Sequence, residues 1–268
     1  MLKFANHLVI TRGGTSETGT IKANISNIIL EYGDHDVDEY FMEFVPPVFQ
    51  SEIKSFWGCL FDVADAVKHI HHLKVNTEGR TQGFNGWHAK IKPDNILTVQ
   101  GQFKLADPGF ATFVKKKNTE TDPKKVVAGG TETYSAPERR YSSSGTREGA
   151  VSQKIDIWSL GCVFSIAATW VVLGHEGIRQ FTELRQRSIR KIIGQQAAQL
   201  TGPYPNLDYF HNGREVLPDV LSWHAYLRSV LRKSDTITSS VLDLIDNEMF
   251  VGDAGCRIKA TELLQKTG

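Results

Sequence analysis

A polar loop followed by a tight hairpin constrains the fold of this chain more than any other feature. The segment His88-Ala89-Lys90-Ile91-Lys92-Pro93-Asp94-Asn95 is followed by two short β-prone runs, 96–99 and 102–105, on either side of Gln100-Gly101. Two such runs around a turn of this composition predict a β-hairpin. The hairpin leads directly into Ala106-Asp107-Pro108-Gly109, so the sequence places an aspartate at its end.

Two further motifs follow in a fixed order. They are Gly130-Thr131-Glu132-Thr133-Tyr134-Ser135-Ala136-Pro137-Glu138 and Asp156-Ile157-Trp158-Ser159-Leu160-Gly161. The four motifs together resemble the catalytic loop, metal-binding turn, activation-segment end and central helix of the serine/threonine branch of the eukaryotic protein kinases. The resemblance extends from about residue 27 to the C-terminus. It implies an α+β, protein-kinase-like fold with a mainly helical large lobe and a remnant small β lobe.

The resemblance implies a role for each polar residue of the loop. Kinases of this family carry His-Arg-Asp-x-Lys-x-x-Asn, in which the Asp accepts the substrate hydroxyl proton. Lys90 stands at the position of that Asp, and Lys92 would steady the transferring phosphoryl group. Asn95 and Asp107 would be the ligands of Mg²⁺, which prefers oxygen donors. The catalytic residues implied are therefore Lys90, Lys92 and Asn95.

The substitution at Lys90 predicts impaired catalysis. An ammonium group only donates hydrogen bonds, so it cannot take a proton from a serine or threonine hydroxyl. Loss of a general base typically costs about 10²- to 10⁴-fold in rate; the other interpretation is that Lys90 neutralises phosphate charge. The neighbouring Ala89 replaces an arginine that in this family binds an activation-segment phosphate. Phosphorylation of Thr119, Thr121 or Thr131 is therefore not expected to act through this position.

The resemblance also implies ATP and Mg²⁺ as cofactors. The runs 24–32 and 40–45 are interpreted as the last two strands of the small lobe, with Glu43, Phe44 and Val45 as the hinge that meets an adenine. Leu97 and Asp107 complete the predicted cofactor-binding residues. The residues before 24 contain no Gly-x-Gly-x-x-Gly, and Lys22 is predicted to be a surface lysine. The chain is thus expected to begin near the fourth strand and to bind nucleotide weakly or not at all.

The remaining sequence predicts a mainly helical body. The domain prediction is a small lobe and hinge at 1–45 and a large lobe at 46–268. Pro46-Pro47 precedes a strongly amphipathic helix at 51–72, and the segment 74–86 is predicted to be a polar insertion. Further helices are predicted at 157–174, 178–200, 216–233, 236–247 and 259–266. Asp156 is expected to hold the loop backbone, and Glu138 and Arg257 to form a partly buried ion pair.

Composition and charge exclude several classes of partner. The formal net charge is +1 with both signs interspersed, so neither a nucleic acid nor a membrane is expected to bind. The apolar run 157–174 is predicted to be a core helix rather than a membrane span, and His69, His71 and His72 are not expected to form a metal site. Three widely spaced cysteines favour a reduced intracellular location, cytoplasmic or nuclear.

Three functions remain open at this point. The leading hypothesis is a pseudokinase that binds or scaffolds a protein partner. The alternative is an active ATP-dependent serine/threonine protein kinase that transfers phosphate to protein hydroxyls. The third is a decayed gene product without a function of its own. An ATP-dependent phosphorylation assay separates the second from the other two.

Overall fold

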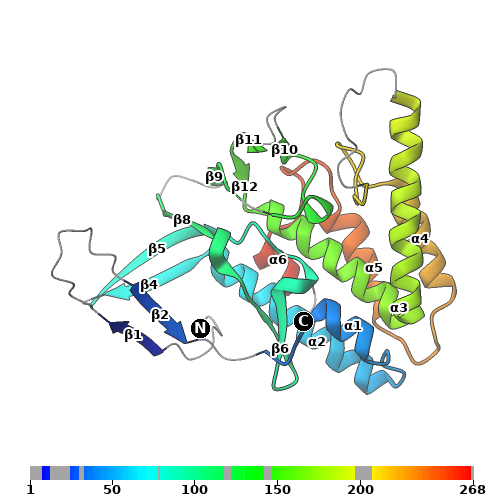
Figure 1. Cartoon of the computed structure of the whole chain (residues 1–268), viewed down its shortest axis with the longest axis horizontal. Coiled ribbons are helices and arrows are strands. Elements are labelled where there is room, and N and C mark those ends of the chain that lie inside the picture. Colours follow the sequence, from blue (N-terminus) through cyan, green and yellow to red (C-terminus); the bar gives the residue numbers. More distant parts are fainter. Residues whose placement is uncertain are drawn as a thin grey trace, which may run out of the picture.

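The computed structural model describes residues 8–12, 25–29, 33–77, 79–117, 122–128, 130–141, 147–196 and 207–266. The predictions for Lys22, Thr119 and Thr121 lie outside these ranges. Helices gather on the right of Figure 1, and the strands β1, β2, β4 and β5, whose bounds are given below, lie on the left. Helices combined with small antiparallel sheets confirm the predicted α+β class.

Two long helices form the centre of the hydrophobic core. Helix α2 spans Gln50–His71 and buries one stripe, which includes Ile53, Leu60 and Val67. Helix α3 spans Lys154–Gln196 and breaks at Gly174, whose φ of 71° and ψ of −168° are outside the helical region. Glycine has no Cβ atom and adopts positive φ without a steric clash, so it suits this break. The predicted helix at 157–174 is therefore confirmed.

Helix α3 is long and apolar enough, by length and composition alone, to cross a membrane. Its most apolar 18-residue window has a mean hydropathy of 1.8, yet 78% of that window is buried inside the protein. Burial of this kind is typical of the core helix of a globular domain, in agreement with the prediction. The compartment in which the protein works remains a prediction.

The predicted hairpin is present at the expected residues. Strand β6, Ile96–Val99, pairs antiparallel with β7, Gln102–Leu105, and the short β3, His35–Asp36, joins the other edge of β6. Gln100 and Gly101 have φ values of 50° and 74°. Positive φ at both central residues is typical of a type I′ turn, whose twist matches that of the two flanking strands. The hairpin thus joins the polar loop to Asp107 through a short, well-defined turn.

A second sheet forms from the predicted polar insertion at residues 74–86, for which the sequence predicted no strands. Strands β4, Leu73–Thr77, and β5, Arg80–Trp87, form a hairpin there. Strand β8, Thr112–Lys115, pairs with the other edge of β5. Polar residues hid the strand signal because only the C-terminal end of β5 is buried. The polar loop therefore starts directly from a sheet.

The predicted strand at residues 40–45 is wrong. Residues Val37–Glu43 form helix α1, which begins at Asp36. The Asp36 carboxylate accepts a hydrogen bond from the Glu39 N–H, and the Glu39 carboxylate accepts one from the Asp36 N–H. This reciprocal capping box stabilises a helix start. Phe41 of α1 is buried in the helical core, although the predicted small lobe extends to residue 45. The domain boundary at 45 stays a prediction.

The remaining elements complete the helical body. Helix α4 covers Pro218–Ser229, α5 covers Thr238–Leu244 and continues as a π-helical turn at Ile245–Met249, and α6 covers Ala260–Gln265. The strand pairs are β1 with β2 (Leu8–Arg12, Ile25–Ile29), β9 with β12 (Lys124–Lys125, Val151–Ser152) and β10 with β11 (Arg140–Tyr141, Arg147–Glu148). The helices predicted at 216–233 and 259–266 are present but shorter, and the one predicted at 236–247 is present two residues later in the chain.

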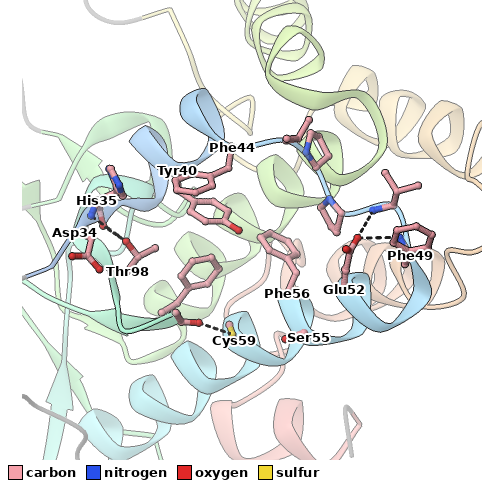
Figure 2. A pocket seen from close by; sticks show the side chains of 16 residues that line it. Asp34, His35, Tyr40, Phe44, Phe49, Glu52, Ser55, Phe56, Cys59 and Thr98 are labelled. Carbon is pink, nitrogen blue, oxygen red and sulfur yellow. Dashed lines mark hydrogen bonds between the residues drawn. The ribbon is translucent and has the colours of Figure 1, made fainter.

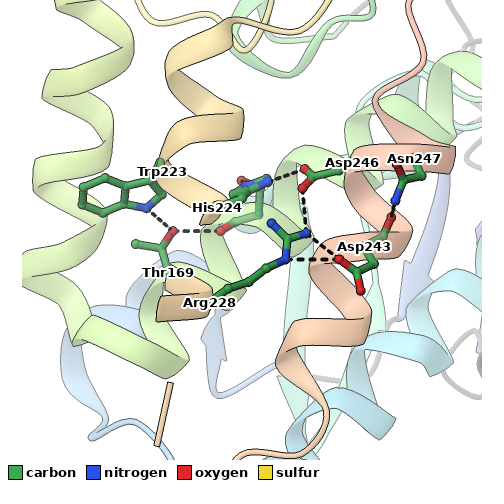
Figure 3. Close-up of polar contacts among 8 residues, drawn as sticks. Thr169, Trp223, His224, Arg228, Asp243, Asp246 and Asn247 are labelled. Atoms are coloured by element: carbon green, nitrogen blue, oxygen red, sulfur yellow. Dashed lines mark hydrogen bonds and ion pairs between the residues drawn. The ribbon is translucent and has the colours of Figure 1, made fainter. Parts of the chain in front are cut away.

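A buried polar network joins α3, α4 and the π-helical turn (Figure 3). Both ring nitrogens of His224 form hydrogen bonds. Nε2 lies 2.7 Å from Ser165 Oγ, and Nδ1 lies 2.5 Å from Asp246 Oδ1. Arg228 donates to Asp246 Oδ2 at 2.7 Å. Ser165 and His224 have no exposed surface. This Ser–His–Asp arrangement therefore cannot meet a substrate and is structural.

The network makes stability depend on acid pH. Burial raises the pKa of Asp246, but the hydrogen bonds from His224 and Arg228 outweigh this and hold its pKa below the ordinary 3.8. A carboxyl group with a depressed folded pKa contributes stability above its unfolded pKa and loses it as the pH falls through the folded pKa. Asp246→Asn should lower the free energy of unfolding by about 1–3 kcal/mol near neutral pH.

The measurement is urea unfolding of wild type and Asp246→Asn between pH 7 and pH 2.5. The difference in unfolding free energy should be constant at neutral pH and should shrink below the unfolded pKa of 3.8. A difference that stays the same down to the lowest pH would show that ionised Asp246 does not stabilise the fold.

Candidate active site

Asp156 holds the backbone of the polar loop. Its carboxylate, which is 1% exposed, accepts the N–H groups of His88 and Ala89, each at 2.8 Å. His71 of α2 lies 3.1 Å from the same carboxylate. Burial raises the pKa of Asp156. The hydrogen bonds and the nearby imidazoles outweigh this effect and hold the pKa below its ordinary value, so the group stays ionised. The predicted structural role of Asp156 is confirmed.

The backbone at Ala89 lies in an uncommon conformation that the surroundings stabilise. Ala89 has a φ of 63°, which costs energy for a residue with a side chain. The guanidinium of Arg139, which is buried, donates to the Ala89 carbonyl at 3.2 Å and to the Val127 carbonyl at 3.2 Å. An arginine from the activation-segment end therefore contacts the loop where the expected arginine is missing, a contact that the sequence did not predict.

Lys90 forms an ion pair with Asp107. Its Nζ lies 2.6 Å from Asp107 Oδ2 and 4.7 Å from the centre of the Phe110 ring. The hydrogen bond from Lys90 holds the pKa of Asp107 below its ordinary value. Both side chains are only partly buried, at 23% and 43% exposure. The predicted metal ligand therefore already has a cation within contact distance.

The turn after Asp107 begins in an uncommon backbone conformation. Pro108 favours extended dihedrals for the preceding residue. Asp107 instead has φ 52° and ψ 63°, in the left-handed region, and a short 3₁₀ turn follows at Pro108–Phe110. Its other carboxylate oxygen accepts from the Gly109 N–H at 3.4 Å. Aspartate tolerates this region better than most residues. The hydrogen bonds from Lys90 and Gly109 offset the conformational cost that remains.

The remaining loop residues are also engaged. Lys92 Nζ lies 2.5 Å from Asp94 Oδ2, so a second lysine–carboxylate pair lies in the loop. The Asn95 amide donates to the Lys90 carbonyl at 2.8 Å, and the Asn95 carbonyl accepts from the Ala106 N–H at 2.8 Å. These bonds tie the loop to the far end of the hairpin. The structure thus brings Lys90 into contact with both Asn95 and Asp107, and the catalytic and metal-binding roles of these residues stay predictions.

The predicted cofactor residues are not brought into one pocket. Leu97 lies on β6 against the backbone of Gly33, where an added Cβ would be 2.9 Å from the Leu97 Cβ. Glu43 ends helix α1 and pairs with His35 at 3.5 Å. Phe44 and Val45 line a groove whose lining includes neither Leu97 nor Asp107. Binding of a nucleotide by these residues stays a prediction.

The groove itself was not foreseen as a separate site. It has a volume of about 990 Å³ and lies between α1, the start of α2 and the tip of the β6–β7 hairpin. Figure 2 shows Tyr40 and Phe44 facing Phe56. It also shows the Glu52 carboxylate bonded to the backbone of residues 44–49, the connection between α1 and α2. The connection exposes apolar side chains: Phe44 by 45%, Val45 by 88%, Val48 by 48% and Phe49 by 68%. A sequence signal existed in the run Phe44-Val45-Pro46-Pro47-Val48-Phe49.

The predicted structural ion pair is confirmed. Arg257 Nη1 and Nη2 lie 2.8 and 3.0 Å from the two carboxylate oxygens of Glu138. The guanidinium also donates to the carbonyls of Val251 and Lys154 and stacks over the Trp158 ring at 5.1 Å. Arg257 is 1% exposed. This bidentate pair fixes the activation-segment end to the segment before α6, and the bond to the Lys154 carbonyl extends the link to the start of α3.

Comparison with known proteins agrees with the motifs. The family model for the protein kinase domain matches residues 6–267. The chain is 27% identical over 143 residues to the serine/threonine-protein kinase mph1 of Schizosaccharomyces pombe, and 29% over 141 residues to the dual specificity protein kinase TTK of Mus musculus. It is 27% identical over 178 residues to the serine/threonine-protein kinase RIM11/MSD1 of Saccharomyces cerevisiae.

The aligned regions cover only part of each protein. They include 51% of this chain for the first two relatives and 65% for the third. They include 19%, 14% and 41% of the relatives themselves, in the same order. The chain therefore spans less than half the length of these relatives.

Proposed function

The chain belongs to the protein kinase domain family, and on that premise we propose that its domain is catalytically impaired and works by binding a protein partner. The observation that carries the first half is the 2.6 Å contact between Lys90 Nζ and Asp107 Oδ2. At the loop position where the family has a proton acceptor, the side chain is a cation. That cation neutralises the carboxylate that would bind a metal.

The donor set fits Mg²⁺ poorly in this arrangement. Mg²⁺ keeps several waters and is usually held by one or two carboxylates together with phosphates. The neighbouring residues offer one carboxylate, Asp107, and that group is bound to an ammonium. Asp94, the nearest acidic residue of the loop, is paired with Lys92 in the same way. A divalent cation would have to displace Lys90 against charge repulsion, so no metal-dependent step is assigned to this site.

Two measurements test the loss of catalysis. Purified protein with Mg²⁺ and radiolabelled ATP should transfer no phosphate to protein substrates above the level of an Asp107→Asn variant. For each of these two proteins, the melting temperature should be the same with and without Mg²⁺–ATP. Transfer by wild type that disappears in Asp107→Asn would identify an active kinase and refute the proposal.

The groove supports the second half of the proposal. Contiguous exposed apolar side chains of this kind mark interaction sites on soluble proteins. The adjoining helix α1 is acidic, carrying Asp38, Glu39 and Glu43 after the capping Asp36. Burial, together with the charges of Asp94 and Asp36, raises the pKa of Asp38, as expected where carboxylates crowd. The complementary partner is an extended peptide segment with basic residues beside apolar ones.

A peptide selection tests the groove directly. A library of 12-residue peptides selected on wild type should yield sequences with Lys or Arg next to large apolar residues. Binding should weaken at least about tenfold in Val45→Ser/Phe49→Ser, because hot-spot apolar contacts are each worth more than 1 kcal/mol. The matched control is Val126→Ser, since Val126 is 57% exposed outside the groove. Selected peptides that bind the double variant as well as wild type would exclude this surface.

A further inference from the structure

A second, small cavity lies beside strand β5. Its volume is about 90 Å³, and it lies where the end of α2, strand β5 and the starts of α3 and α6 meet. The volume exceeds the roughly 10–15 Å³ that a cavity needs to hold one water molecule. It is therefore large enough for a small ion and too small for a nucleotide. The residues that line it are His71, His72, Asn85, Lys116, Asp122, Pro123, Gln153, Lys154, Ile157, Lys259 and Ala260.

The cavity wall contains the buried polar side chains of Asn85 and Lys154. Asn85 is 3% exposed, and it lines the cavity from strand β5. Lys154 is 7% exposed, and its ammonium donates to the Gly255 carbonyl at 2.8 Å. Within the described ranges no carboxylate pairs with Lys154. A buried charge without a counterion is costly, so Lys154 points to a missing anion.

The rest of the cavity wall is positively charged. Lys116 and Lys259 line it from the activation segment and from the residue before α6, and His72 adds an imidazole. Burial lowers the pKa of His72, and the charges of His71, Lys116 and Lys259 lower it further. The one carboxylate in the lining, Asp122, is exposed. Cations therefore outnumber acidic groups around the cavity.

We propose that this cavity binds a small tetrahedral dianion of the phosphate class. Lys154 and Asn85 would donate from the buried wall, and Lys116 and Lys259 would close the exposed side. The α3 backbone begins at Lys154, so its N-terminal dipole adds a favourable field for an anion. The cavity is separate from the Lys90–Asp107 site, and its test does not depend on the catalytic state of the domain.

The test is a titration with inorganic phosphate at constant ionic strength, with chloride as the compensating ion. Wild type should gain melting temperature, and NMR should show the pKa of His72 rising as phosphate binds. Lys116→Gln and Lys259→Gln should each weaken binding about tenfold, the value of one hydrogen bond to a charged group. Lys54→Gln is the matched control, an exposed lysine of α2 outside the cavity, and should bind like wild type.

A buried substitution gives an independent result. Lys154→Met should melt at or above the wild-type temperature without phosphate, because it removes an uncompensated charge, and it should lose the gain produced by phosphate. O-phospho-L-threonine distinguishes the source of the anion: tighter binding than inorganic phosphate indicates a phosphorylated side chain, and exclusion indicates the free ion. The proposal is overturned if phosphate leaves His72 unchanged, or if both exposed lysine variants respond to phosphate as wild type does.

Discussion

Replacing Arg257 by methionine should lower the free energy of unfolding by about 3–5 kcal/mol, the usual cost of breaking one partner of a buried ion pair. Methionine keeps much of the apolar bulk over Trp158 but leaves the Glu138 carboxylate without its bidentate partner. The carbonyls of Val251 and Lys154 also lose their donors. Chemical denaturation followed by tryptophan fluorescence measures the change, because Trp158 lies in contact with the guanidinium.

The matched control is Arg187→Met on helix α3. Arg187 also forms an ion pair, with Glu183 at 3.2 Å, but its side chain is 67% exposed. Exposed pairs contribute little because water screens them, so this variant should unfold close to the wild-type midpoint. Equal losses in the two variants would mean that the buried ion pair of Arg257 stabilises the fold no more than the exposed pair of Arg187.

The sequence predicted the parts of the fold that depend on local signals. The β6–β7 hairpin was predicted at its observed residues because two β-prone runs flank the Gln100-Gly101 turn, where glycine adopts positive φ at no steric cost. The strand predicted at 40–45 failed because its apolar run matches both a strand and a helix. The capping box at Asp36 decides for the helix, and Phe41 packs on Trp170 with 5.1 Å between ring centres.

The site was predicted in part. The roles of Asp156, Glu138 and Arg257 followed from the resemblance and are present in the geometry. The pairing of Lys90 with Asp107 could not be predicted, since the two residues are 17 positions apart and meet only through the hairpin. The positions of Asn85 and Lys154 in one cavity wall depend likewise on tertiary packing. Such contacts between distant segments carry no signal in local sequence.

Removing the charge of Lys90 should create a divalent-cation site at Asp107. Two unit charges about 4 Å apart interact by about 4 kcal/mol at an effective dielectric constant of 20. Asp107 is 43% exposed, so solvent and salt screen part of this repulsion. Lys90→Met should therefore bind Mn²⁺ about ten- to a hundredfold more tightly than wild type. Paramagnetic broadening of NMR signals around Asp107 measures both the affinity and the place.

Two variants establish that the new affinity belongs to Asp107. Lys90→Met/Asp107→Asn should lose it, because the ligand is gone while the cation stays absent. Lys92→Met should leave Mn²⁺ binding at Asp107 unchanged, because Lys92 pairs with Asp94 instead. The pKa of Asp107 should also rise toward its ordinary value in Lys90→Met, since the hydrogen bond from Lys90 is the first cause of its depression. Wild type that binds Mn²⁺ at Asp107 as tightly as Lys90→Met would show that Lys90 does not compete with a metal.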